Sequence, residues 1–188
     1  MSNTHAHESL KSFSLMLDNH KQREPLYFSF DLQKLNKEIL ERYRTLFRWQ
    51  YRDSLRSFTN PDISDLTDRQ LSYANRFQEY FGVNQIEACL ANPKLVATTW
   101  DPKRDLTRTP RPCLLSFRLI QDGKWLHIAV VFRAREMLRR MVGNWYCFME
   151  FQREICEKRD LKPGKIYDFS MEAWFQKSDR INWEKEGR

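Results

Sequence analysis

Residues 100 to 144 form the most informative part of the chain and read WDPKRDLTRTPRPCLLSFRLIQDGKWLHIAVVFRAREMLRRMVGN, from Trp100 to Asn144. Its middle holds two apolar runs, CLLSFRLI and WLHIAVVF, which are separated by the turn sequence QDGK. Apolar runs of this length on either side of a glycine turn predict a β-hairpin. Cys113 opens the first strand and Arg133 follows the second. We therefore expect a thiol and a guanidinium on neighbouring strands of one sheet.

This pairing of a cysteine with an arginine has a chemical consequence. A nearby positive charge favours the ionised thiol, and the thiolate is the nucleophilic form. The guanidinium of Arg133 also offers a planar fork of donors for a phosphate. The pair predicts attack by Cys113 on an anionic, phosphorylated substrate. Each residue also has a plainer interpretation, because free cysteines often belong to the core and most arginines are surface charges.

Hydrophobic spacing and breaker residues predict the other elements. Apolar residues at helical spacing over 31–50 predict an amphipathic helix. Two capping boxes, Thr67–Gln70 and Asn84–Glu87, predict the starts of two further helices, the first of which Gly82 ends. The remaining expectations are strands over 94–100, 113–121 and 125–133, a helix over 144–159, a turn at Lys162-Pro163-Gly164, and a last strand over 165–176.

Length and composition indicate one globular domain. The chain has 188 residues, of which 41% are hydrophobic, enough for a single core without disulfides or metals. We expect a mobile polar tail over 1–24 and one domain over 25–188. The four cysteines show no CxxC pairing, residues 1 to 20 carry no apolar signal-peptide core, and no run is long enough to span a membrane. The expected setting is a reducing cytoplasm.

The net charge favours acidic ligands. It is +7, with a local excess of arginines at positions 133, 135, 139 and 140. Such a balance suits nucleotides and permits nucleic acid, which we do not favour. His5 and His7 lie in the polar tail without further ligands, so we expect no metal site.

Several motifs follow one another in a fixed order. They are WDP at 100–102, PC at 112–113, DGK at 122–124, FRARE at 132–136 and Asn144, with NQIEACLANP upstream and LKPGKIYDFSMEAWF downstream. In this order and spacing, the chain over residues 70 to 178 resembles thymidylate synthase, and it is most similar to the short, archaeal-type members. The resemblance implies an α/β (α+β) fold with a mixed β-sheet flanked by helices.

The resemblance also implies an activity. Cys113 would add to C6 of a pyrimidine nucleoside monophosphate, so that C5 can attack a one-carbon unit from 5,10-methylenetetrahydrofolate. Arg133 would hold the 5′-phosphate and Asn144 would contact the base edge. The other substrate-binding positions implied are Glu136, Arg118, Trp100 and Trp174. The outcome would be methylation or hydroxymethylation, and the protein would form a homodimer through its sheets.

Departures from the family pattern leave alternatives open. Leu114 follows the cysteine where the family has His or Thr, Arg118 replaces a glutamine, Ala134 replaces a phosphate-contacting serine, Trp174-Phe175-Gln176 replaces HxY, and Pro93 and Lys94 match the paired arginines of a dimer partner. The chain also stops near the start of the family's folate-closing segment. A non-catalytic nucleotide-binding or assembly module is therefore the second hypothesis. Asn144 could instead be a helix N-cap, and Glu136 could pair with Arg140 at i+4.

Overall fold

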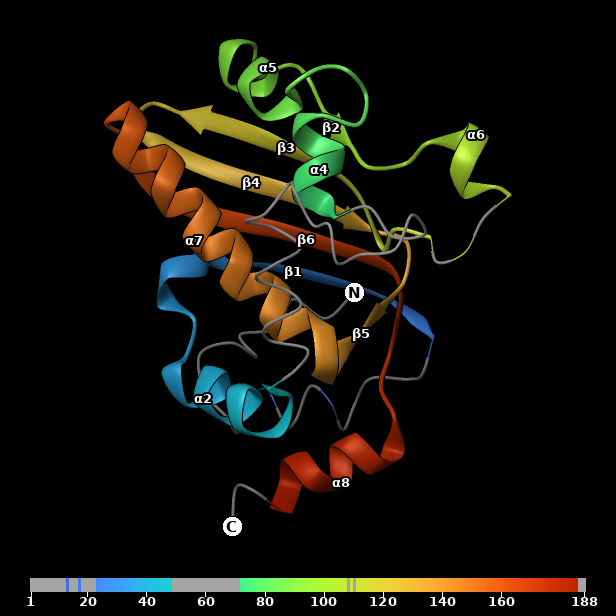
Figure 1. Ribbon diagram of the computed structural model, residues 1–188. Helices are drawn as coiled ribbons and strands as arrows, with labels where there is room; N and C mark the ends of the chain where they lie inside the picture. The colour runs from blue at the N-terminus through green and yellow to red at the C-terminus, as the bar shows by residue number, and fades with distance from the viewer. Residues whose placement is uncertain are drawn as a thin grey trace.

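A six-stranded mixed β-sheet with helices packed against it forms the body of the molecule (Figure 1). The computed structural model describes residues 13, 17, 23–48, 72–107, 109 and 111–185. The strands are β1 (Glu24–Asp31), β2 (Ala97–Thr98), β3 (Leu114–Asp122), β4 (Trp125–Phe132), β5 (Arg135–Glu136) and β6 (Lys162–Trp174). They lie in the order β1-β6-β4-β3-β2, and β5 pairs with β6. The predicted mixed α/β architecture is confirmed.

Helices occur both before and after the β3–β4 hairpin along the chain. They are η1 (Leu32–Lys34), α2 (Lys37–Leu46), α4 (Tyr73–Gln78), α5 (Gln85–Ala91), α6 (Pro102–Asp105), the π-helix η2 (Met137–Met141), α7 (Val142–Arg159) and α8 (Lys177–Lys185). None of the helices in the described part of the chain has the length and apolar content needed to span a bilayer.

The β3–β4 hairpin forms as the sequence predicts. The strands pair antiparallel from Leu114 opposite Phe132 to Asp122 opposite Trp125. Gly123 takes a φ of 56° in the turn, a conformation that favours glycine. Helix α7 then crosses the sheet and returns the chain to β6, which pairs parallel to β4 (Figure 1). This β4–α7–β6 connection is the crossover that parallel strands require.

The core lies between α7 and one face of the sheet. Trp145 of α7 is buried, and its ring packs edge-on against Phe28 and Phe30 of β1, with centroid distances of 5.0 and 4.9 Å. Side chains that alternate with the buried ones occupy the opposite face of the sheet. There Trp125 and Met171 are 50% and 47% exposed. The two faces thus differ, because one is covered by helices and the other presents aromatic and aliphatic groups.

Several sequence expectations need correction near the amino terminus. The segment 24–31 is a strand, and the helix expected over 31–50 is α2, which begins only at Lys37 after the N-cap Asn36. Phe13 and Leu17, in the segment expected to be a tail, are buried in the core. The Thr67–Gln70 box lies outside the described residues, and Ser72 caps α4. This helix ends at Gln78 rather than at Gly82.

Other corrections concern the ends of the later elements. The strand expected over 94–100 is reduced to Ala97–Thr98. The turn expected at Lys162-Pro163-Gly164 is already the start of β6. Gly164 lies against β4 there, where a Cβ atom would come within 2.6 Å of His127 Nδ1. The glycine therefore permits close strand pairing rather than a turn. The Asn84 cap of α5 is confirmed, since its side chain accepts from Ile86 N and Glu87 N.

Candidate active site

Cys113 and Arg133 meet at one end of the hairpin. The amide of Arg133 donates to the carbonyl oxygen of Cys113 at 2.7 Å, one residue beyond the paired Leu114 and Phe132. Cys113 is half-buried, whereas Arg133 is exposed. The geometry places the two residues next to each other at one end of strands β3 and β4, as the sequence predicts.

Tyr73, at the first position of α4, lies beside this cysteine. Its hydroxyl accepts a hydrogen bond from the amide of Leu114 at 3.3 Å. Burial and the nearby Cys113 thiol raise the pKa of Tyr73 to about 12, although backbone hydrogen bonds and the charge of Arg140 oppose the rise. The phenol therefore stays protonated at neutral pH and can donate a hydrogen bond. The phenol of Tyr73 and the thiol of Cys113 thus lie close together at the start of β3, and the charge of Arg140 acts on the phenol.

Sequence analysis did not identify Tyr73. The residue lies next to Ala74 and close to Phe77, which carry the apolar face of α4, so its spacing indicated only a packing role. Its contact with Leu114 spans 41 positions of the chain. A tyrosine directly after the N-cap Ser72 was the available signal, and that signal is weak.

The other three cysteines differ from Cys113 in their burial. Cys89, Cys147 and Cys156 are 2%, 3% and 3% exposed. Burial raises the pKa of each of these thiols above its ordinary value. A buried neutral thiol is a poor nucleophile. Of the four cysteines, all of which are free, Cys113 is the one that solvent reaches.

The second arginine of the FRARE motif has a structural role. Arg135 is 2% exposed, and its Nη2 lies 2.7 and 2.8 Å from the two carboxylate oxygens of Asp168. The indole of Trp145 donates to the same carboxylate at 2.7 Å, and the guanidinium stacks 4.0 Å from the centroid of the Phe132 ring. Asp168, which sequence analysis did not identify, thereby joins β6 to the start of α7.

Glu136 is a buried carboxyl group on the short strand β5, which follows β4. It is 6% exposed and lies opposite Trp174 in the β5–β6 pairing. Burial is the main cause that raises the pKa of Glu136 to about 7, and the charge of Asp179 adds to it. One carboxylate oxygen accepts from the amide of Arg139, and the other, Oε1, has no hydrogen-bond partner among the described residues. The register brings two predicted site residues, Glu136 and Trp174, together.

Asn144 is not a helix N-cap. It lies within the first turn of α7, whose cap position is Met141, and it is 6% exposed. The π-helix η2 runs directly into α7, so no break in the backbone leaves an amide for Asn144 to cap. Arg140 and Asn144 are about one helical turn apart, a spacing that places side chains on one face of a helix.

Arg118 does not join this group. It is exposed on β3, and its Nε donates to the carbonyl oxygen of Pro93 at 3.0 Å. Five residues of extended chain separate it from Cys113, which corresponds to about 16 Å along a strand. Its guanidinium fastens the segment after α5 to the sheet.

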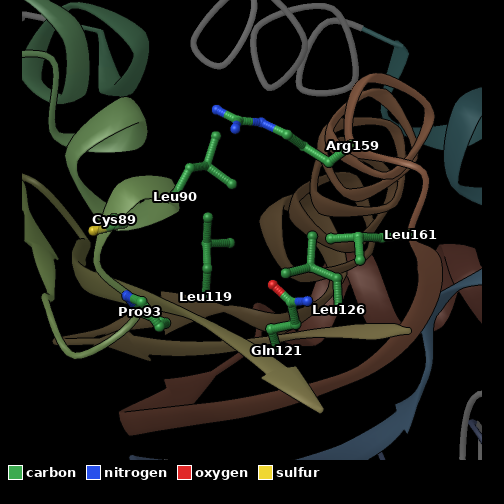
Figure 2. Close-up of a pocket in the computed structure, with 8 residues that line it drawn as sticks. All are labelled: Cys89, Leu90, Pro93, Leu119, Gln121, Leu126, Arg159 and Leu161. Carbon is green, nitrogen blue, oxygen red and sulfur yellow. The ribbon is translucent and has the colours of Figure 1, made fainter. Parts of the chain in front are cut away.

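A small pocket lies at the far end of the hairpin, between α5 and the end of α7 (Figure 2). Its volume is about 160 Å³, and its apolar wall consists of Leu90, Pro93, Leu119, Leu126 and Leu161. Cys89 and Arg159 also line it. The guanidinium of Arg159 bonds to Glu87 at 3.2 Å. The pocket contains none of the predicted site residues.

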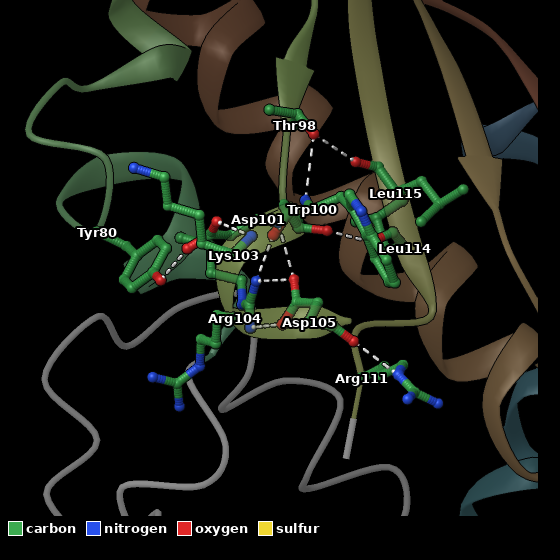
Figure 3. Close-up of polar contacts among 12 residues, drawn as sticks. Tyr80, Thr98, Trp100, Asp101, Lys103, Arg104, Asp105, Arg111, Leu114 and Leu115 are labelled. Atoms are coloured by element: carbon green, nitrogen blue, oxygen red, sulfur yellow. Dashed lines mark hydrogen bonds and ion pairs between the residues drawn. The ribbon is translucent and has the colours of Figure 1, made fainter. Parts of the chain in front are cut away.

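Trp100 lies two residues after the end of β2 and is half-buried beside the start of β3 (Figure 3). Its amide donates to Thr98 Oγ1 at 3.2 Å. The preceding residue, Thr99, donates its amide to the Leu115 carbonyl at 2.9 Å and its hydroxyl to the Leu114 carbonyl. These bonds place the backbone of the Trp100 segment alongside the Cys113 strand. No group of three or more His, Cys, Asp or Glu side chains among the described residues could hold a metal ion.

Comparison with known proteins adds one informative similarity. No protein-family model matches the chain. It is 25% identical over 123 residues to a protein of Methanopyrus kandleri named "Putative thymidylate synthase", a match that covers 61% of this chain. The chain spans 59% of the length of that relative. The sequence is therefore similar, at low identity, to a protein of thymidylate-synthase type.

Proposed function

We propose that this protein transfers a one-carbon unit to C5 of a pyrimidine nucleotide through an adduct between Cys113 and C6 of the base. The observation that carries the proposal is the half-buried Cys113 thiol at the start of β3, with Arg133 beside it and the Tyr73 hydroxyl hydrogen-bonded to the amide of the next residue, Leu114. The similarity to the Methanopyrus protein supports the same chemistry.

The first step would use the thiolate of Cys113. Its sulfur forms a bond to C6, and the electron pair of the C5–C6 double bond moves to C5 and the adjoining carbonyl. Tyr73 remains protonated at neutral pH, with its pKa raised to about 12, so its hydroxyl can stabilise negative charge on the sulfur. Arg140 contributes a positive charge to the same place.

Nucleotide recognition would fall to the residues around the thiol. Arg133 would hold the 5′-phosphate with its planar fork, and Asn144 would donate to or accept from the base edge. Trp174 would stack on the ligand or fill the pocket, because an indole cannot accept a hydrogen bond. The base and sugar could be those of dUMP, dCMP, a ribonucleotide or a modified base in DNA.

The one-carbon donor is proposed to be 5,10-methylenetetrahydrofolate. Glu136 Oε1 is a buried carboxylate oxygen without a partner among the described residues, and such an atom suits the N–H donors of a pterin ring. Trp100, half-buried beside the Cys113 strand, offers an aromatic surface to the same ring. The bound folate would supply the one-carbon unit. Hydroxymethylation would take up water, whereas methylation would also need a hydride, which tetrahydrofolate would donate as it is oxidised to dihydrofolate.

The release of the C5 hydrogen tests this function. When C5 acquires a carbon substituent, it loses its hydrogen, so 5-tritiated pyrimidine nucleoside monophosphates with methylenetetrahydrofolate should release tritium to water. The Cys113→Ser variant should release none. Absence of release from every nucleotide of a deoxyuridine, deoxycytidine and ribonucleotide panel would contradict the proposal.

A non-catalytic nucleotide-binding or assembly module remains the second candidate. Two arginines of the resemblance are engaged within the protein, Arg118 by the Pro93 carbonyl and Arg135 by Asp168. Such a module would bind nucleoside monophosphates in the absence of tritium release. The Arg133 affinity measurement described below therefore separates it from a protein without a nucleotide site.

The face of the sheet opposite the described helices supports a homodimer. Its side chains are apolar or aromatic and half-buried or exposed, including Tyr27, Ile120, Trp125, Val131, Tyr167, Phe169 and Met171. A second copy would cover this face and remove it from water. We expect a dimer in sedimentation at micromolar concentration, and a monomer there would contradict the assignment.

A further inference from the structure

A buried ion pair ties the Trp100 segment to helix α4 (Figure 3). Arg76 and Asp105 form two parallel hydrogen bonds, Nη1 to Oδ2 at 2.8 Å and Nη2 to Oδ1 at 2.9 Å. Their side chains are only 3% and 2% exposed. The guanidinium also donates to the Thr99 carbonyl, and Oδ2 of Asp105 accepts from the amide of Asp101 at 2.8 Å. The pair thus holds the segment before α6, and the end of α6 itself, at several points.

The same contacts continue to the strand that carries the nucleophile. Thr99, held by Arg76, bonds in turn to the carbonyl oxygens of Leu114 and Leu115. Tyr73 lies three residues before Arg76 on α4, and its hydroxyl accepts from the amide of Leu114. Helix α4 therefore contacts the start of β3 through Tyr73 and the Trp100 segment through Arg76.

A buried ion pair is weak evidence for stability. The loss of hydration offsets most of the attraction, and well-packed apolar side chains of similar volume often serve the fold equally well. What apolar side chains cannot reproduce is the directional fork of Arg76, which fixes the Thr99 carbonyl and Asp105 relative to each other. The pair therefore fixes the relative positions of these groups more than it stabilises the fold.

We propose that Arg76 and Asp105 are positioning residues of the Cys113 site. Their ion pair holds the Trp100 segment against the start of β3 and so limits access to the Cys113 thiol. The inference rests on the proposed function, because it takes Cys113 as the reactive group. Its test, however, needs no nucleotide, so it can fail or succeed separately from the tritium-release assay.

The test is the rate of Cys113 alkylation by iodoacetamide across pH, with the labelled cysteine identified by peptide mapping. At pH values where the thiol is ionised, the plateau rate reports access, and the midpoint of the profile reports the local charge. The double variant Arg76→Met/Asp105→Leu should raise the plateau roughly fivefold as the loop opens more often. The midpoint and the melting temperature should stay close to those of the wild type, which a purely structural role would not predict.

A matched control is available at the far end of the hairpin. Arg159 and Glu87 form an exposed ion pair between two helices. Arg159→Met/Glu87→Leu should leave the Cys113 plateau unchanged. The proposal would be overturned if the plateau rate of Cys113 alkylation in Arg76→Met/Asp105→Leu equalled that of the wild type. It would also be overturned if the control variant showed an equal increase in that rate. If the double variant does not fold, Arg76→Lys decides, because an ammonium keeps the charge without the fork. An increase of roughly twofold would then support positioning, and the wild-type rate would overturn it.

Discussion

A cysteine and an arginine lie beside each end of the β3–β4 hairpin, but their surroundings differ. At one end the half-buried Cys113 lies beside Arg133 and near the phenol of Tyr73, and the charge of Arg140 acts on that phenol. At the other end Cys89 is 2% exposed in a pocket that leucines, Gln121 and Arg159 also line, and Arg159 is bonded to Glu87. The cysteine is therefore a candidate nucleophile at one end of the hairpin, whereas at the other end it is a buried packing residue.

What separates the two ends is burial and the polar partners that surround each thiol. Burial raises the pKa of Cys89, so its thiol stays neutral. The Cys113 end instead collects polar groups, including the buried carboxyl of Glu136. Polar groups kept in this way often cost stability and serve function. The predictions below test this division between a reactive end and a structural end.

The largest expected difference is in thiol reactivity. At neutral pH, Cys113 should react with iodoacetamide on the order of a thousandfold faster than Cys89, which reacts only when the structure opens. Peptide mapping after a timed reaction measures both rates in one sample. Equal labelling, or faster labelling of Cys89, would show that the two ends do not differ in the proposed way.

Burial of the Glu136 carboxyl should make the free energy of unfolding depend on pH. The pKa of Glu136 is raised from 4.5 in the unfolded chain to about 7. Below pH 4.5 both states are protonated and nothing is lost, whereas between pH 4.5 and 7 only the unfolded state ionises. Wild-type stability should therefore fall over this window by about 3 kcal/mol from this group and stay reduced above it.

Glu136→Gln should remove that loss. Denaturant unfolding at pH 4.5 and pH 8 should give a variant that gains stability relative to wild type only at the higher pH. The control is Glu154→Gln, an exposed position on α7 that should change stability by less than about 0.5 kcal/mol. If the advantage of Glu136→Gln does not grow with pH, the carboxyl is not held neutral.

The smallest expected effect separates the two arginines. Arg133→Ala should weaken binding of a nucleoside monophosphate about ten- to hundredfold, because a charge-assisted fork to phosphate is lost. Arg133→Lys should recover part of that affinity, and Arg159→Ala should change nothing. Calorimetric titration with the monophosphate and with the bare nucleoside checks the assignment. If the wild type binds both equally well, Arg133 is not a phosphate anchor.

Sequence patterns predicted the elements whose signals are local. The hairpin around Gly123, the Asn84 cap of α5 and most of α7 follow from neighbouring residues. Strand β1 was missed because Leu32, Leu35 and Ile39 continue at helical spacing directly after it. The Asn144 cap was wrong because the π-helix before α7 leaves no break in the backbone.

The site was predictable only where a motif marks it. Cys113 and Arg133 are neighbours across the hairpin because β3 and β4 have similar lengths, so that one begins where the other ends. The partners that organise the site are far apart in the chain, with Arg135 and Asp168 separated by 33 positions and Arg76 and Asp105 by 29. Such pairings depend on how helices and strands dock, which local periodicity does not specify.

The most direct test of the central claim, that Cys113 is the nucleophile for a pyrimidine ring, is intact-mass analysis. The protein is incubated with 5-fluoropyrimidine nucleoside monophosphates, with and without methylenetetrahydrofolate, and the adduct is located by peptide mapping. The proposed function predicts a mass increase of one nucleotide at Cys113, extended by the folate when it is present, and none in Cys113→Ser. An unmodified mass with every nucleotide, or an adduct on another cysteine, would contradict it.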